Sequence, residues 1–174
     1  MLKAVNLTKK FDDLVAVDHI NAEIKSGSVF GLIGTNGAGK STLMKILSGV
    51  YTKDSGQILV DGQEVEITGV ESAKEHGIRI IHQELMLIPD MTISENIFIG
   101  QEPKTKAGTV DKKKMNEMAQ GFLDSMHLDL KSTQFIRDLN IAQQQMVEII
   151  RAISFGAKII VMDEPTSSLT ENEV

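Results

Sequence analysis

The sequence predicts an α/β fold with a mostly parallel sheet, an antiparallel β edge and a helical subdomain. Three observations predict it. Short apolar runs alternate with segments of helical period, which is typical of strands joined by helices. A hairpin signal lies in the first half of the chain, and two amphipathic helices are expected in the second half.

The composition is that of a folded domain in a reducing compartment, and we expect the cytosol. The chain has 174 residues, 41% of them hydrophobic and 24% charged, and it has no cysteine. These values exclude a disordered chain, a disulfide framework and a thiolate zinc site. The net charge of −6 argues against nucleic acid as a partner. The longest uncharged stretch, residues 26–39, is too short to span a membrane.

The strands and helices are expected from hydrophobic period and turn residues. Strands are expected at 2–7, 20–24, 29–33, 57–60, 65–67, 78–81 and 158–162. Helices are expected at 40–47, 70–76, 111–127 and 141–155. Val29–Ile33 is an unbroken apolar run and is expected to be buried. Asp61-Gly62 is the turn of the hairpin, because both residue types tolerate positive φ.

A glycine-rich segment between a predicted strand and a predicted helix carries the strongest motif. It reads Gly34-Thr35-Asn36-Gly37-Ala38-Gly39-Lys40-Ser41-Thr42 and matches the phosphate-binding loop pattern. The glycines let backbone N–H groups converge on phosphate, Lys40 reaches the β and γ oxygens, and Ser41 ligates Mg²⁺. A glycine-rich turn is the alternative interpretation, but such a turn has no need for Lys-Ser after its last glycine.

Two acidic residues follow the last predicted strand. Asp163 and Glu164 come directly after Ile159–Met162. Asp163 is expected to hold the magnesium shell, and Glu164 to orient or deprotonate the water that attacks the γ-phosphate. A capped loop is the alternative, and the phosphate-binding loop earlier in the chain favours the catalytic interpretation.

With these motifs the whole chain resembles the ATP-binding cassette (ABC) ATPases. The resemblance implies a P-loop NTPase fold of ABC type that hydrolyses ATP with Mg²⁺, with Lys40, Gln83 and Glu164 as catalytic residues. Phe11 matches the aromatic residue that stacks on adenine, an ordinary core Phe being the alternative. Gln83 matches the glutamine that reaches magnesium and the attacking water. The expected metal ligands are therefore Ser41, Gln83 and Asp163.

A further motif of the family contacts the nucleotide of a partner domain. Asn140, Ile141, Ala142 and Gln143 occupy the position of this signature sequence. Asn140 replaces the usual Ser, while Ile141 and Ala142 replace two glycines, and the Cβ of Ile141 obstructs close approach to phosphate. A plain helix start is the alternative interpretation of this segment.

Three segments are similar to the ATP-binding subunits of bacterial importers for ribose, galactose or xylose. They are residues 81–85, 93–98 and 143–149. The resemblance implies ATP hydrolysis coupled to sugar import through a membrane permease, at the cytoplasmic face of the cell membrane. It also implies a second ABC domain arranged head to tail. Nucleic acid is not expected as a partner, and no direct contact with sugar is expected.

The resemblance divides the chain into a core, about 1–83 and 157–174, and a helical subdomain, about 84–156. Met1 lies ten residues before Phe11, so we expect the first of two tandem cassettes. All four histidines precede Asp163, so none of them matches the switch histidine of the family. We therefore expect a truncated cassette.

Three other functions compete with the sugar importer. The first is a nucleotide-binding module without turnover, which the missing switch histidine and the altered signature favour. The second is a soluble cassette protein of DNA repair or translation, which the acidic charge disfavours. The third is a small P-loop kinase, which the long helical region between Lys40 and Asp163 disfavours.

Overall fold

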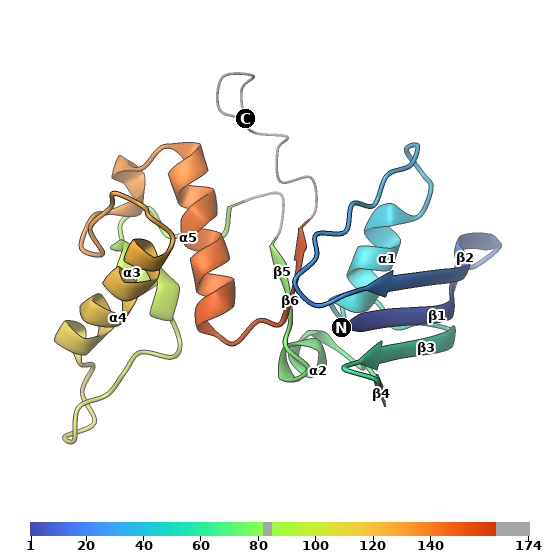
Figure 1. Ribbon diagram of the computed structural model, residues 1–174, viewed down its shortest axis with the longest axis horizontal. Helices are drawn as coiled ribbons and strands as arrows, with labels where there is room; N and C mark the ends of the chain where they lie inside the picture. The colour runs from blue at the N-terminus through green and yellow to red at the C-terminus, as the bar shows by residue number, and fades with distance from the viewer. Residues whose placement is uncertain (82–84, 163–174) are drawn as a thin grey trace. The chain divides into compact units, whose positions relative to one another are not determined.

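The computed structural model describes residues 1–81 and 85–162 of the chain. These residues form two compact units (Figure 1). The first contains residues 1–80 and 158–162, and the second contains residue 81 and residues 85–157. Each unit has its own cluster of buried hydrophobic side chains.

A four-stranded antiparallel sheet forms much of the first unit. Its strands lie in the order β2-β1-β3-β4. They are β1 (Leu2–Phe11), β2 (Leu14–Ile24), β3 (Ser55–Val60) and β4 (Gln63–Val65). Strand β1 lies inside the sheet, so that Leu2 is paired with Ile24 on one side and with Val60 on the other. The apolar residues Leu2 and Ala4 face the core, as the alternation in the sequence predicts.

The turn between β3 and β4 confirms the predicted hairpin. Asp61 and Gly62 have φ angles of 53° and 83°. Positive φ at both central residues is the geometry of the type I′ turn, whose twist matches that of the flanking strands. The turn sets the register of the hairpin, in which Ile58 is paired with Val65.

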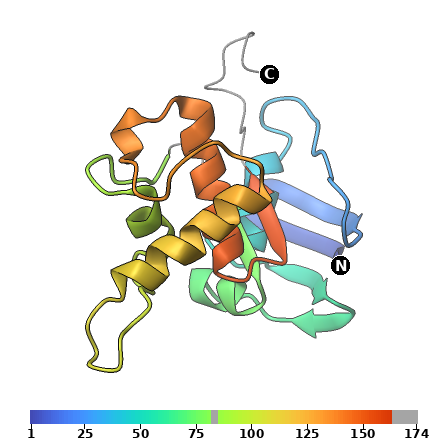
Figure 2. The same ribbon diagram turned by 60° about the vertical axis from the view of Figure 1, so that its left-hand side comes forward.

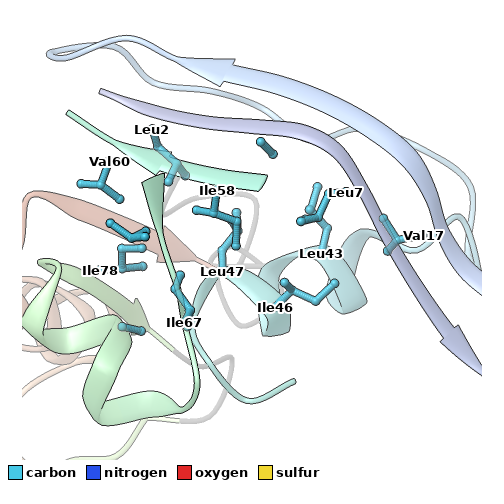
Figure 3. Close-up of a cluster of buried hydrophobic side chains, with 13 residues drawn as sticks. Leu2, Leu7, Val17, Leu43, Ile46, Leu47, Ile58, Val60, Ile67 and Ile78 are labelled. Atoms are coloured by element: carbon cyan, nitrogen blue, oxygen red, sulfur yellow. The ribbon is translucent and has the colours of Figure 1, made fainter. Parts of the chain in front are cut away.

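Two helices complete the first core. They are α1 (Lys40–Leu47) and α2 (Val70–Glu75), and both were expected. The apolar face of α1 consists of Leu43, Ile46 and Leu47, which are buried. Figure 3 shows these side chains in one cluster with Leu7 and Ile58 of the sheet. Burial of this face therefore fixes α1 on the sheet. It stabilises the fold by about 25 cal/mol for each Å² of apolar surface removed from water.

A separate two-stranded sheet joins the distant segments β5 (Ile78–Ile81) and β6 (Ile159–Met162). The carbonyl oxygen of Gly77 accepts hydrogen bonds from the amides of Lys158 and Ile159, at 2.8 and 3.1 Å. Both strands thus begin at the same end of the sheet and run parallel. Their carboxyl ends lead to Gln83 on one strand and to Asp163 and Glu164 on the other, residues that lie outside the described part of the chain.

The prediction that Val29–Ile33 is a buried strand is wrong. The segment has no strand geometry, and the residues Val29 and Ile33 have exposed fractions of 102% and 96%. A buried parallel strand needs hydrogen-bonded neighbours at both edges and covering layers on both faces. Among the described residues β5 and β6 pair only with each other, so the apolar run lacks such neighbours.

The second unit is helical. It contains α3 (Ile93–Phe98), α4 (Lys112–Ser125), a short 3₁₀ helix η1 (Ile136–Asp138) and α5 (Ile141–Ser154). The expected helices at 111–127 and 141–155 are confirmed to within two residues. Figure 2 shows the loop between α3 and α4 projecting from the helices. Within residues 1–81 and 85–162, none of the helices has the length and hydrophobicity needed to cross a bilayer.

The buried cluster of the second unit joins all four of its helices. Its fully buried members include Ile97 of α3, Leu123 of α4, Ile136 of η1 and Ile150 of α5. Helices shorter than about 12 residues are marginal in isolation, so α3 and η1 depend on this packing.

Helix α3 was not expected, although its start carries a recognisable signal. The amide of Glu95 donates to Thr92 Oγ1 at 3.3 Å, and the amide of Thr92 donates to Glu95 Oε2 at 3.0 Å. This reciprocal capping box belongs to the pattern Thr-x-x-Glu. The hydrogen bond from the Thr92 amide, helped by the ammonium of Lys112, lowers the pKa of the Glu95 carboxyl below its ordinary value of 4.5.

Replacing Thr92 by alanine tests the contribution of this cap. Thr92→Ala leaves the Glu95 amide without its side-chain acceptor, so we expect the free energy of unfolding to fall by about 1 kcal/mol. Chemical denaturation measures the change. Thr133→Ala, at an exposed threonine of the same unit, is the control and should leave stability unchanged. Equal losses in both variants would contradict the capping role.

Glu95 also predicts a pH dependence of stability. The pKa of Glu95 is lower in the folded protein than in the unfolded chain. Its stabilising effect is therefore complete above pH 4.5 and is lost as the pH falls through the folded-state pKa. We expect wild type to be more stable than Glu95→Gln at pH 7, with the difference vanishing in acid. Denaturation of both proteins from pH 7 to pH 3 measures it, and parallel pH profiles would contradict the prediction.

Candidate functional site

The glycine-rich loop leads directly into α1 and has the conformation that its glycines allow. Gly37 and Gly39 have φ angles of 81° and 84°, in the left-handed region that favours glycine. A Cβ on Gly39 would also overlap the carbonyl oxygen of Ala16 in β2. Gly39 is therefore required both by its backbone angle and by its contact with the neighbouring strand.

Lys40 holds the loop in a closed curve. Its Nζ donates hydrogen bonds to the carbonyl oxygens of Gly34 at 2.7 Å and Thr35 at 2.9 Å. The amide of Ala38 donates to the same Thr35 oxygen at 3.2 Å. The ammonium thus lies against the start of the loop, within reach of any group that the loop encloses.

The amino terminus of α1 is open to a ligand. Its N-cap is Gly39, which has no side chain to accept a hydrogen bond from the first turn. Amide groups left unpaired at a helix start, together with the positive end of the helix dipole, attract phosphate and other anions. The first turn carries Lys40 and the exposed Ser41, whose hydroxyl makes no hydrogen bond within the described part of the chain. A hydroxyl oxygen is a suitable ligand for Mg²⁺.

Phe11 is the last residue of β1, and the residue is 37% exposed. Tyr51 packs edge to face against it, with 5.1 Å between the ring centroids. The ammonium of Lys9 lies 5.5 Å from the centroid of the Phe11 ring. Tyr51 was not anticipated from the sequence, since it is an isolated aromatic residue in a turn and belongs to no motif.

An ion pair holds Lys9 in this position. Its Nζ lies 2.8 Å from Asp54 Oδ1, and the amide of Lys10 donates to Asp54 Oδ2 at 2.6 Å. The hydrogen bond from Lys9, followed by that from the Lys10 amide, lowers the pKa of the Asp54 carboxyl below its ordinary value. The carboxylate therefore stays ionised and keeps the cation beside the Phe11 ring.

The four signature residues start α5 in the second unit. Asn140 is the N-cap, and its Oδ1 accepts the amide of Gln143 at 2.8 Å, while Gln143 Oε1 accepts the amide of Asn140 at 3.0 Å. The pattern Asn-x-x-Gln could have predicted this capping box. Ile141 is 42% exposed, so its bulk lies at the surface of the helix start.

The predicted site residues are thus described in two groups. Phe11 and residues 34–42 belong to the first unit, and Asn140–Gln143 belong to the second. Gln83, Asp163 and Glu164 lie outside the described residues. Within the described residues, no group of three or more His, Cys, Asp or Glu side chains could hold a metal ion.

Two curated relatives are similar over almost the entire chain. One is a putative ribose/galactose/methyl galactoside import ATP-binding protein of Halalkalibacterium halodurans, 47% identical over 100% of this chain and 34% of its own length. The other is the ribose import ATP-binding protein RbsA of Clostridium perfringens, 48% identical over 99% of this chain and 35% of its own length. The chain therefore spans about a third of the curated relatives that it matches.

Solved structures have the same fold. An ATP-binding cassette of an ABC transporter in its ADP conformation superposes with a TM-score of 0.80 at 26% identity, covering 97% of this chain and 70% of that one. A dimeric cassette bound to ADP and Pi superposes with a TM-score of 0.71 at 26% identity, covering 99% of this chain and 78% of that one. The expected P-loop NTPase fold of ABC type is confirmed. The expectation of a mostly parallel sheet does not hold for the described residues, because four of their strands form an antiparallel sheet and only β5 and β6 run parallel.

The family model for ABC transporters matches residues 17–167. This range includes the glycine-rich loop, the open start of α1 and the capped start of α5. Because the match extends over most of the chain, the protein belongs to the ABC transporter family.

Proposed function

We propose that this protein binds ATP with Mg²⁺ at the start of α1 and hydrolyses it. The observation that carries the proposal is the glycine-rich loop closed around Lys40 at a helix start that no side chain caps. That arrangement offers backbone N–H groups and one ammonium to a phosphate chain. In this proposal the aromatic ring of Phe11 stacks on the adenine base.

The loop residues divide the work of holding the nucleotide. Residues 34–39 supply the curve and the amides, Lys40 contacts the β and γ phosphates, and Ser41 and Thr42 begin the helix at the phosphate end. Ser41, Gln83 and Asp163 hold magnesium, whose charge, when it is bound, offsets that of the phosphates. All three side chains offer oxygen atoms, as this hard cation prefers.

Hydrolysis requires a positioned water. Glu164 takes a proton from this water or orients it, and Gln83 contacts the same water. Lys40 stabilises the charge that grows on the γ-phosphate oxygens. Asn140–Gln143 contact the nucleotide of a second ABC domain. The similarity to a dimeric cassette structure supports a second domain as partner.

We further propose that hydrolysis drives sugar import through a membrane permease, with this chain at the cytoplasmic face of the membrane. Both relatives described above are import ATP-binding proteins, which supports this role. The chain itself contacts neither sugar nor nucleic acid in this proposal. The first unit is the nucleotide-binding core, and the second is the helical subdomain that presents the signature.

A second candidate function is ATP binding without turnover. The capping box at α5 favours it, because the amide of Gln143 is already bonded to Asn140 and is not free for a partner's phosphate. Ile141 and Ala142 carry side chains where the family has glycines. These side chains limit how closely a partner's phosphate can approach the backbone of the helix start.

Thermal unfolding with and without Mg-ATP tests nucleotide binding. A ligand at a hundredfold excess over its Kd stabilises the folded state by about 2.7 kcal/mol. We expect this shift in wild type and in the control Lys45→Ala, whose lysine lies on α1 beside Tyr51. Lys40→Ala should lose most of the shift. Equal shifts in Lys40→Ala and wild type would contradict the assignment of the loop.

Glu164→Gln separates turnover from binding. The amide keeps the size of the carboxylate but cannot take a proton, so we expect kcat for ATP to fall by about 100-fold or more. The Kd for Mg-ATP should stay within about twofold of wild type, since the phosphate-binding groups are unchanged. A phosphate-release assay with equilibrium titration measures both. An unchanged kcat would remove Glu164 from its role, and a wild type that binds without turnover would favour the second candidate.

A further inference from the structure

The glycine-rich loop contains a tight turn with Asn36 and Gly37 at its centre. The amide of Ala38 donates to the carbonyl oxygen of Thr35 at 3.2 Å, and this hydrogen bond closes the turn. Gly37 has a φ of 81°, and a positive φ at the third residue is typical of a type II turn. The closing bond does not use the amide of Gly37, which donates no hydrogen bond to any described residue.

The side chain of Asn36 has no partner either. The residue is exposed, and its carboxamide makes no hydrogen bond within residues 1–81 and 85–162. All other asparagines in these ranges have hydrogen-bonded side chains, namely Asn6, Asn21, Asn96, Asn116 and Asn140. Asn36 therefore differs from them in that no contact fixes the orientation of its carboxamide.

The residue after Asn36 leaves the carboxamide accessible to the backbone. Asn36 is the only asparagine in the sequence that precedes a glycine, and each of the others precedes a residue with a Cβ, which hinders approach of the backbone nitrogen. Even a Cβ placed on Gly37 would meet no atom within 4 Å beyond its chain neighbours. An unpaired carboxamide and an unpaired backbone amide thus lie next to each other in an open turn.

We propose that Asn36 is a site of spontaneous deamidation, and that a nucleotide bound to the loop protects it. The nitrogen of Gly37 loses its proton to solvent and bonds to Cγ of Asn36, while the bond between Cγ and the side-chain nitrogen breaks. Ammonia leaves, and a cyclic succinimide remains. A water molecule then opens the ring to aspartate or isoaspartate. The reaction consumes only this water and needs no oxidant or reductant.

Protection by nucleotide rests on the proposed function. In that proposal the amides of residues 34–39 bind phosphate, so the nitrogen of Gly37 keeps its proton and does not attack. The reaction also damages the site. Aspartate at position 36 puts a negative charge close to the phosphates, and isoaspartate adds a methylene group to the backbone of the curve. The loop without nucleotide is therefore the form that is lost with time.

Peptide mass analysis of the incubated protein measures the modification. Folded wild type without nucleotide should convert Asn36 at a rate within about tenfold of the same chain unfolded in urea, because the turn leaves both reacting groups unpaired. The rate should be higher at pH 9 than at pH 7, since the attacking nitrogen must lose a proton. Asn36→Gln is the control, and its longer side chain should leave residue 36 unmodified.

Nucleotide should change the rate through occupancy of the loop. Mg-ATP at a hundredfold excess over its Kd leaves about 1% of the protein free, so we expect the rate to fall by about tenfold or more. Lys40→Ala should lose this protection. Asn36→Asp copies one product, and its Kd for Mg-ATP should rise about tenfold or more. Gln63→Glu adds the same charge at an exposed position of β4 and should keep the wild-type Kd.

Slower conversion of Asn36 in the folded protein than in the unfolded chain, by about 100-fold or more, would overturn the assignment of the site. Conversion of the other asparagines at the rate of Asn36 would also overturn it. A protein that binds Mg-ATP and still converts Asn36 at the full rate would contradict the protection. A wild type whose thermal unfolding does not respond to Mg-ATP contradicts the proposed function instead, and the rate without nucleotide then decides the site on its own.

Discussion

The packing of α1 on the antiparallel sheet is the interaction on which the rest of the first unit depends. Leu43, Ile46 and Leu47 lie among residues of β1, β2 and β3. This contact brings the amino end of the helix to β2, where Gly39 approaches Ala16 so closely that a methyl group would not fit. Apolar residues at the far end of the helix thereby determine where its unpaired amide groups lie.

Local signals in the sequence predicted much of this fold. Asp61-Gly62 predicts its own turn because the required φ angles depend on two residues alone. Asp111 and Gly156 likewise mark the limits of α4 and α5, since helix ends are decided by neighbouring residues. The loop at 34–42 was identifiable for the same reason, because its glycines and Lys40 act within a single contiguous segment.

Features that depend on distant residues could not be predicted in this way. Val29–Ile33 has the composition of a buried strand, yet a strand also needs partners, and its composition does not specify them. The contact between Phe11 and Tyr51 joins the end of β1 to the segment between α1 and β3, without any periodic pattern. Glu148 and Arg151 of α5 bind the backbone of Met86, more than sixty residues earlier in the chain. The sequence around Glu148 alone indicates an ordinary surface position of an amphipathic helix.

The two hydrogen bonds from Lys40 to the loop carbonyl groups have a thermodynamic consequence. They hold the loop in its curved form before any ligand arrives, so association does not require the backbone to lose conformational entropy at that point. In the proposed function, an incoming phosphate competes with two neutral carbonyl oxygens for the ammonium of Lys40, and an anionic oxygen is the stronger acceptor. In that function, Lys40 therefore exchanges its hydrogen bonds to two carbonyl oxygens of its own chain for contacts with the phosphate oxygens of the ligand.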